Sequence, residues 1–177
     1  GRPADTTSRL PKEIRTYDLL DSLGIAYARA DHDTLPTMEA CQEVGNLLGI
    51  EICKNLFLRN TQKTAFYLLI LPGSKKFKTA ALSKQIGSAR LSFAEPEFME
   101  QYLNITPGSV SVLGLMNDPE NKVRLLIDKD ILKNHPYFGC HPCINTSSLK
   151  FRTEDLLNKI LPAIHHDYTM VDLPYAE

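Results

Sequence analysis

The segment Cys140-His141-Pro142-Cys143 places two thiols and an imidazole within four residues, so it is the first candidate for chemistry. A structural zinc site needs a second ligand pair at similar spacing, and the other cysteines, Cys41 and Cys53, lie twelve residues apart. A thioredoxin-like redox pair would open a helix, which the residues after Cys143 do not do. We therefore predict four free thiols, with neither a metal site nor a cofactor.

The same segment favours a different use. Gly139, His141 and Pro142 are typical of a tight loop whose backbone N–H groups and imidazole face a ligand. No Gly-x-Ser-x-Gly elbow surrounds a serine or cysteine, so the sequence shows no nucleophile triad. His32, between two aspartates, is interpreted as a turn residue and not as a base.

Charge is distributed unevenly along the chain. Residues 52–94 carry eight Lys and Arg and no Asp or Glu, whereas the rest of the chain holds 12 basic and 21 acidic residues. Such separation indicates an anionic ligand, although acids from elsewhere in the fold could also neutralise this run. Lys54 stands at the entry of an apolar strand within it, directly before Asn55.

The elements that must position these residues can be outlined from the pattern. The chain of 177 residues, 43% hydrophobic and 23% charged, is typical of one soluble globular domain, which we expect over residues 10–177 after a flexible stretch at 1–9. No apolar run is long enough to span a bilayer, and no signal peptide is evident, so we expect a cytoplasmic protein. Helices are predicted at 11–23, 37–48 with Thr37 as cap, 79–85, 96–103 and 153–161. Strands are predicted at 25–29, 55–58, 65–71, 90–93, 110–115, 123–128 and 168–173, with an irregular stretch up to residue 143.

Interleaved helices and strands with hairpin-like pairs among them favour an α/β domain. The sheet is expected to be mixed and largely antiparallel, with flanking helices, and not doubly wound and parallel.

Several motifs in this order resemble a known family. They are Lys54-Asn55-Leu56-Phe57-Leu58, Ile86 to Phe93, Thr106-Pro107-Gly108-Ser109-Val110 and His141-Pro142-x-x-Asn145. Together they resemble the prolyl-tRNA editing family (the YbaK or ProX group), which is related to the editing domain inserted in bacterial prolyl-tRNA synthetases. The resemblance runs from about Pro11 to Leu173 and is greatest to the branch that hydrolyses Ala-tRNA(Pro).

The resemblance implies an enzyme, an aminoacyl-tRNA deacylase that removes alanine from tRNA(Pro) by ester hydrolysis and excludes proline by size. It implies Lys54 and His141 as catalytic residues, with Lys54 holding the terminal phosphate or the aminoacyl end. Asn55, Gly139, Pro142 and Asn145 would bind the substrate. The implied contacts to the acceptor end of the tRNA are Arg59, Lys75, Lys76 and Arg90.

Alternatives remain open at this point. Cys140 and Cys143 depart from the alanine branch, so Cys-tRNA(Pro) is the main rival substrate, with serine and threonine esters behind it. A non-catalytic tRNA-binding module and a thiol redox protein are the other two hypotheses. The expected partner is the acceptor end of tRNA(Pro), with prolyl-tRNA synthetase or an elongation factor as its supplier, and neither DNA nor a membrane.

Overall fold

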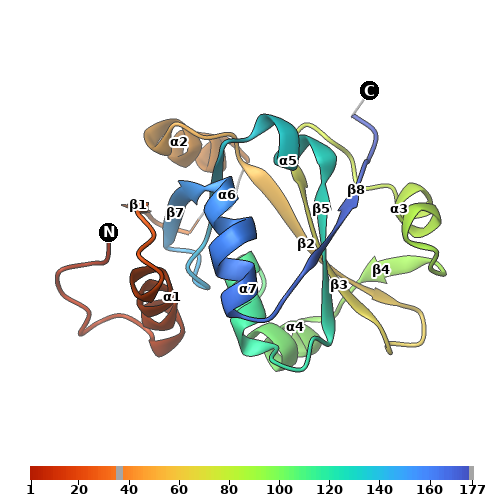
Figure 1. Ribbon diagram of the computed structural model, residues 1–177, viewed down its shortest axis with the longest axis horizontal. Helices are drawn as coiled ribbons and strands as arrows, with labels where there is room; N and C mark the ends of the chain where they lie inside the picture. The colour runs from red at the N-terminus through yellow and green to blue at the C-terminus, as the bar shows by residue number, and fades with distance from the viewer. Residues whose placement is uncertain (35–37, 176–177) are drawn as a thin grey trace.

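Two β-sheets organise the chain, for which the computed structural model describes residues 1–34 and 38–175 (Figure 1). The larger sheet has the strand order β4-β2-β3-β5-β8 and the smaller the order β1-β7-β6. The strands are β1 (Ala28–Asp31), β2 (Cys53–Asn60), β3 (Phe66–Pro72), β4 (Leu91–Phe93), β5 (Val123–Asp128), β6 (Tyr137–Cys140), β7 (Ser147–Arg152) and β8 (Tyr168–Val171).

Four of the six strand pairs are antiparallel, and β5 is parallel to both β3 and β8. The predicted fold class, a mixed and largely antiparallel sheet with flanking helices, is therefore confirmed.

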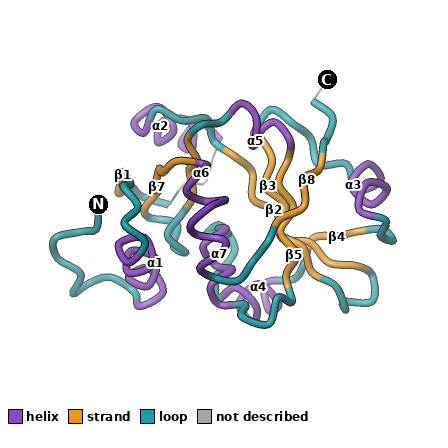
Figure 2. The backbone as a smooth tube through the Cα atoms, in the orientation of Figure 1, coloured by secondary structure: helices purple, strands orange, loops and turns teal. Residues whose placement is uncertain are grey.

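The helices lie around and between the sheets (Figure 2). They are α1 (Pro11–Ser22), α2 (Met38–Leu48), α3 (Thr79–Ile86), α4 (Pro96–Leu103), the 3₁₀ helix η1 (Val112–Asn117) and α5 (Lys129–Asn134). A last helix runs without a break through α6 (Thr153–Asp155), a π-helical segment η2 (Leu156–Ile160) and α7 (Leu161–Ala163). The predicted cap of α2, Thr37, lies outside the described residues.

Strand β2 separates two apolar cores, because successive side chains of a strand point to opposite faces. Phe57 belongs to the main core with α1, η1 and the smaller sheet, whereas Leu58 belongs to a second core with Leu82 of α3 and Leu91 of β4. Each residue of β2 is thereby assigned to one face of the larger sheet. This assignment decides which side chains of the strand can meet at a site.

One predicted strand is wrong. Residues 110–115 were expected to be extended, but Val112–Asn117 form η1, which begins where the Ser111 hydroxyl accepts a hydrogen bond from the Leu113 N–H at 3.1 Å. Gly114 allows the close packing of this turn, since a Cβ there would lie 2.5 Å from the Ile105 side chain. A short apolar run cannot be assigned to strand or helix from periodicity alone.

The stretch before residue 143 is also more regular than predicted. It contains α5 and β6, and β7 follows it, so the smaller sheet was largely missed. Residues 1–9, predicted to be flexible, have defined contacts: Arg2 pairs with Asp18 and Asp21, and Arg9 pairs with Glu13 and Asp31. The domain boundary at residue 10 stays a prediction.

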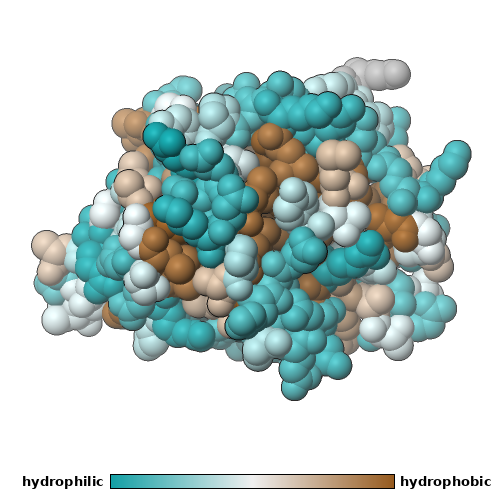
Figure 3. Space-filling model, viewed as in Figure 1, coloured by the Kyte–Doolittle hydropathy of each residue, from teal (hydrophilic) through white to brown (hydrophobic). Residues whose placement is uncertain are grey.

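Apolar residues appear in the middle of the face shown in Figure 3, surrounded by a mainly hydrophilic surface. Within the described residues, no helix has the length and apolar character needed to cross a membrane.

Candidate active site

A cavity of about 220 Å³ lies where α2, the start of β2 and the smaller sheet meet. Two loops, residues 50–52 and residues 108–110, and the end of β6 complete its wall. It is lined by Cys41, Leu48, Ile50, Glu51, Ile52, Cys53, Asn55, Gly108, Val110, Gly139, Cys140, His141 and Ser148. Segments from four parts of the chain therefore line one small, partly open cavity.

Two glycines allow the walls to approach each other. A Cβ at Gly139 would lie 2.1 Å from Cδ1 of Ile50, so only glycine leaves the Ile50 side chain in its place. Gly108 has a φ of +88°, which favours glycine, and a Cβ there would lie 3.6 Å from Nδ2 of Asn145. Asn145 thus packs behind the 106–110 loop, outside the cavity that Gly108 lines.

His141 presents a free lone pair at this site. Its Nδ1 lies 2.8 Å from the carbonyl oxygen of Ser147, which only accepts, so Nδ1 carries the proton and donates it. Nε2 is then an acceptor, and no described residue bonds to it. Burial lowers the pKa of His141, which keeps the ring neutral near pH 7.

Asn55 supplies a second unoccupied acceptor. It lines the cavity from β2, and its Oδ1 is buried with no hydrogen-bond partner among the described residues. A buried amide oxygen without a partner costs roughly 1–3 kcal/mol, so a ligand that donates to it would recover that energy.

Three thiols, those of Cys41, Cys53 and Cys140, also line the cavity. Burial raises the pKa of each of them, to about 12 for Cys53. They are neutral at physiological pH and behave as small apolar groups. No set of three or more His, Cys, Asp or Glu in the described part of the chain is arranged to hold a metal ion.

Lys54, predicted to share a reaction centre with Asn55, does not line the cavity. The alternation along β2 sends it to the opposite face, where its Nζ donates a hydrogen bond to the carbonyl oxygen of Lys75 at 2.8 Å. Adjacency in sequence misled the prediction, because neighbours in a strand face apart.

Two of the predicted tRNA contacts are occupied within the protein. Lys75 is only 2% exposed, and its Nζ lies 3.0 Å from Asp128 and 3.1 Å from Asp172. It is therefore a buried structural cation and not the predicted surface contact. Arg59 forms a bidentate pair with Glu95, with its Nε 2.9 Å from Oε2 and an Nη 2.5 Å from Oε1.

The other predicted residues divide between surface and interior. Lys76 and Arg90 are exposed and have no ion pair with any residue that the structure describes. Gly139 and His141 line the cavity, whereas Pro142 is buried beside it and Asn145 lies behind the 106–110 loop. The structure therefore brings together Asn55, Gly139 and His141 out of the predicted set.

Sequence reasoning missed His32. Its ring centroid lies 6.1 Å from that of His141, and Ser148, to which it is hydrogen-bonded, lines the cavity. The signal that could have found it is the alternation Ala28, Ala30, His32, which continues the face of β1 that bears Ala28 and Ala30.

Comparison with known proteins shows the family of this chain. The profile of the aminoacyl-tRNA editing domain family matches residues 32–159, which include every residue lining the cavity. The chain belongs to this family. It is accordingly a hydrolase of aminoacyl-tRNA esters, and the predicted recognition is confirmed.

Relatives of this editing domain are found in distant organisms. The prolyl-tRNA editing protein ProX of Acetoanaerobium sticklandii is 32% identical over 154 residues, which cover 87% of this chain and 93% of that protein. The prolyl-tRNA synthetase associated domain-containing protein 1 of Bos taurus is 28% identical over 142 residues, 78% of this chain and 82% of the relative.

A solved structure described as a candidate trans-editing enzyme for prolyl-tRNA synthetase has the same fold. Its TM-score is 0.67 at 16% identity, and the match covers 94% of this chain and 99% of that one.

Proposed function

We propose that this protein acts in trans as a deacylase of Ala-tRNA(Pro), with the cavity beside His141 as its amino-acid site. The observation that carries the proposal is a small, partly open cavity with two unoccupied acceptors, within an aminoacyl-tRNA editing domain. The relative named prolyl-tRNA editing protein supports tRNA(Pro) as the RNA.

The cavity suits a small aminoacyl group. Its volume of about 220 Å³ lies below the roughly 300–1,000 Å³ of pockets that hold drug-sized ligands. Leu48, Ile50 and Val110 give it apolar walls. A synthetic site built for proline rejects a smaller amino acid weakly, because a missing methylene is worth only about 1–3 kcal/mol. A second site corrects this error by hydrolysing the smaller ester, and the exclusion of the proline ring would come from the shape of the apolar walls and not from the volume alone.

The acceptors suit the protonated amino group of the ester. Nε2 of His141 and Oδ1 of Asn55 both lack partners in the described structure, and an ammonium group donates three hydrogen bonds. Holding this group would place the ester carbonyl at a fixed position in the cavity. Because an aminoacyl ester is already activated, orientation of the ester and of a water molecule supplies much of the catalysis, without a protein nucleophile.

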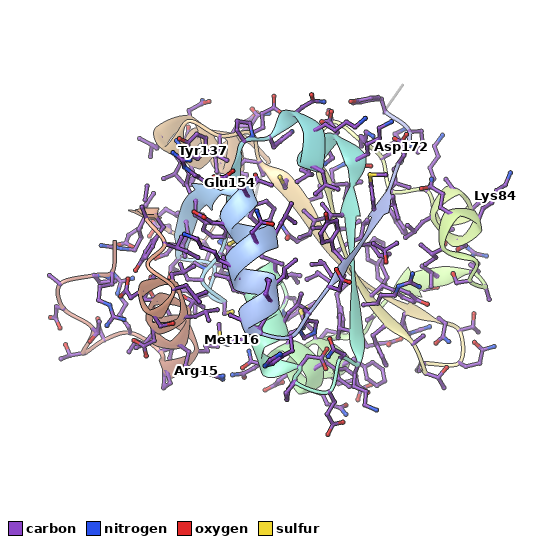
Figure 4. The ribbon with its side chains drawn as sticks, in the orientation of Figure 1. Arg15, Lys84, Met116, Tyr137, Glu154 and Asp172 are labelled. Carbon is purple, nitrogen blue, oxygen red and sulfur yellow. The ribbon has the colours of Figure 1, made fainter. Side chains whose placement is uncertain are left out.

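The RNA would lie over the exposed cations of the acid-free run. Lys76, Lys78, Lys84 and Arg90 are all exposed, and Lys84 extends from α3 away from the body of the molecule (Figure 4). Lys54 is partly exposed and holds only a backbone carbonyl, so we assign its ammonium to an RNA phosphate on the face of the sheet opposite the cavity. Arg59 and Lys75 are not assigned to the RNA, because carboxylates already occupy them.

The test is a deacylation panel across Ala-, Cys-, Ser- and Pro-tRNA(Pro). We expect rapid release of alanine and no release of proline. His141→Ala should lower kcat/KM by about 10–100-fold, the effect of losing one hydrogen bond to a charged group. Lys54→Ala and Arg90→Ala should raise KM and reduce the salt dependence of binding. An intact protein that cleaves none of these esters would refute the proposal.

Cys-tRNA(Pro) is the second candidate substrate, and the three thiols that line the cavity favour it. A cysteine side chain is only one sulfur larger than that of alanine and would meet a soft, polarisable wall. Faster release of cysteine than of alanine in the same panel would select this alternative.

A further inference from the structure

His32 fixes the direction of the hydroxyl of Ser148. The Nδ1 of His32 lies 2.7 Å from the carbonyl oxygen of Asp33, which can only accept, so Nδ1 carries a proton and donates it. In the tautomer with the proton on Nδ1, Nε2 carries the lone pair, and this atom lies 2.8 Å from Oγ of Ser148. Ser148 must therefore donate its single proton to His32. Its remaining lone pairs are free for a group in the cavity that it lines.

The pairing of two strands brings His32 and Ser148 together. Strands β1 and β7 are antiparallel with Ala30 opposite Ser148, and His32 follows Ala30 on the same face of the strand. The His32 N–H donates to the carbonyl oxygen of Thr146 at 2.9 Å, which extends the pairing by one step beyond β1. Ser148 is only 8% exposed. Its hydroxyl is thus held in a defined place by two strands and one imidazole.

The carbonyl holds the imidazole in a fixed orientation, and the imidazole accepts a hydrogen bond from the hydroxyl. Enzymes use this arrangement to let a histidine base take a proton from a hydroxyl group. His141 is not coupled in this way, since its Nε2 has no partner in the described structure. The two ring centroids lie 6.1 Å apart, but only His141 lines the cavity. One is left to hold the substrate, and the other is connected to the cavity through Ser148.

We propose that Ser148 and His32 form a proton relay for the hydrolytic water, with Ser148 as a catalytic residue and His32 as the base behind it. This rests on the proposed deacylase function. As water attacks the carbonyl carbon of the ester, its proton passes to Ser148 Oγ while the Ser148 proton passes to His32 Nε2. The imidazolium keeps its Nδ1 hydrogen bond to Asp33.

The second half of the reaction returns His32 and Ser148 to their starting protonation. When the bond between the carbonyl carbon and the ribose oxygen breaks, His32 returns its proton to Ser148, and Ser148 passes one to the leaving oxygen. The products are the free amino acid and a tRNA with its ribose hydroxyl, and the enzyme regains its starting protonation. Water is the only co-reactant.

The experiment is a double-mutant cycle on the chain of 177 residues, with Ala-tRNA(Pro) as substrate. Ser148→Ala and His32→Ala should each lower kcat by about 100-fold, within the range for general base catalysis, and leave KM nearly unchanged. The double variant should lose no more than either single variant, because both changes break one relay. The solvent deuterium isotope effect on kcat should fall in all three.

Ser83→Ala is the matched control. Ser83 is 9% exposed, and its hydroxyl has no partner among the described residues, so its removal should leave kcat unchanged. Losses that multiply in the double variant, or a Ser148→Ala protein with the kcat of the parent, would overturn the relay while leaving the deacylase function intact. A parent protein that cleaves no ester would remove both.

Discussion

Gly139→Ala is the most direct test of the cavity wall. The added Cβ would lie 2.1 Å from Cδ1 of Ile50, whereas carbon atoms in contact sit about 3.5–4.0 Å apart. Ile50 must therefore move by about 1.5 Å or adopt another rotamer. Gly139 has no positive φ, so its backbone accepts alanine and the effect comes from space alone.

Two separable effects follow from this displacement. Overpacking costs typically about 1–3 kcal/mol of folding stability, and each kcal/mol lowers the Tm of a chain of this length by about 2–4 °C. Activity should fall as well, because Ile50 lines the cavity and a misplacement of about 1 Å in a site can cost about 100-fold. We expect kcat/KM for Ala-tRNA(Pro) to fall by about that factor at a temperature where the variant is folded.

Gly114→Ala is the matched control, since its Cβ would meet Ile105 at 2.5 Å and the backbone oxygen of Leu103 at 3.2 Å. Gly114 does not line the cavity, so its substitution should lower Tm at least as much and leave kcat/KM within about twofold. Thermal unfolding and steady-state deacylation of both variants separate the two effects. A Gly139→Ala enzyme with parental kcat/KM would refute the placement of the amino acid beside Ile50.

Three further predictions concern charges and thiols. Lys75→Met leaves the carboxylate of Asp128, which is 0% exposed, without its cation, and should cost about 3–5 kcal/mol in chemical denaturation with little effect on RNA binding. The bidentate bond from Arg59 lowers the pKa of Glu95 to about 2, so this pair stabilises the protein above the unfolded pKa near 4.5 and loses its effect as pH falls towards 2. Arg59→Met should flatten that part of the stability profile, and an unchanged profile would contradict the assignment. Because burial raises the pKa of the thiols, a thiol reagent at pH 7.5 should leave Cys53 and Cys140 unmodified in the folded protein and react with all four cysteines after unfolding. Rapid modification of Cys140 in the folded state would favour the redox hypothesis, which uses Cys140 and Cys143.

Most regular elements could be read from the sequence because their signals are local. Pro11 and Pro96 lie in the first turns of α1 and α4, and Gly87 with a φ of +67° ends α3, as the pattern predicted. The order of the motifs was enough to identify the family, and so the class of reaction. The apolar run at 110–115 fits either a strand or a helix by its pattern. In the structure Val112–Asn117 form a 3₁₀ helix, in which Gly114 packs closely against Ile105.

Only the tertiary structure showed which of the predicted basic residues are free to bind a ligand. The acid-free run at 52–94 looked like one basic surface, but Asp128 and Asp172, far away in sequence, bury Lys75, and Glu95 holds Arg59. Charge along a chain does not show which acids will fold back onto it.

The sequence by itself determined the family, the fold class and three residues of the cavity, Asn55, Gly139 and His141. The alternation of side chains along a strand already implies that Lys54 faces away from Asn55, but only the tertiary structure showed which of the two faces borders the cavity. It also joined His32 to Ser148, which are 116 residues apart, since the pairing of β1 with β7 brings them onto one face. Such a contact depends on strand register, and register is set by the whole fold and not by the residues that meet.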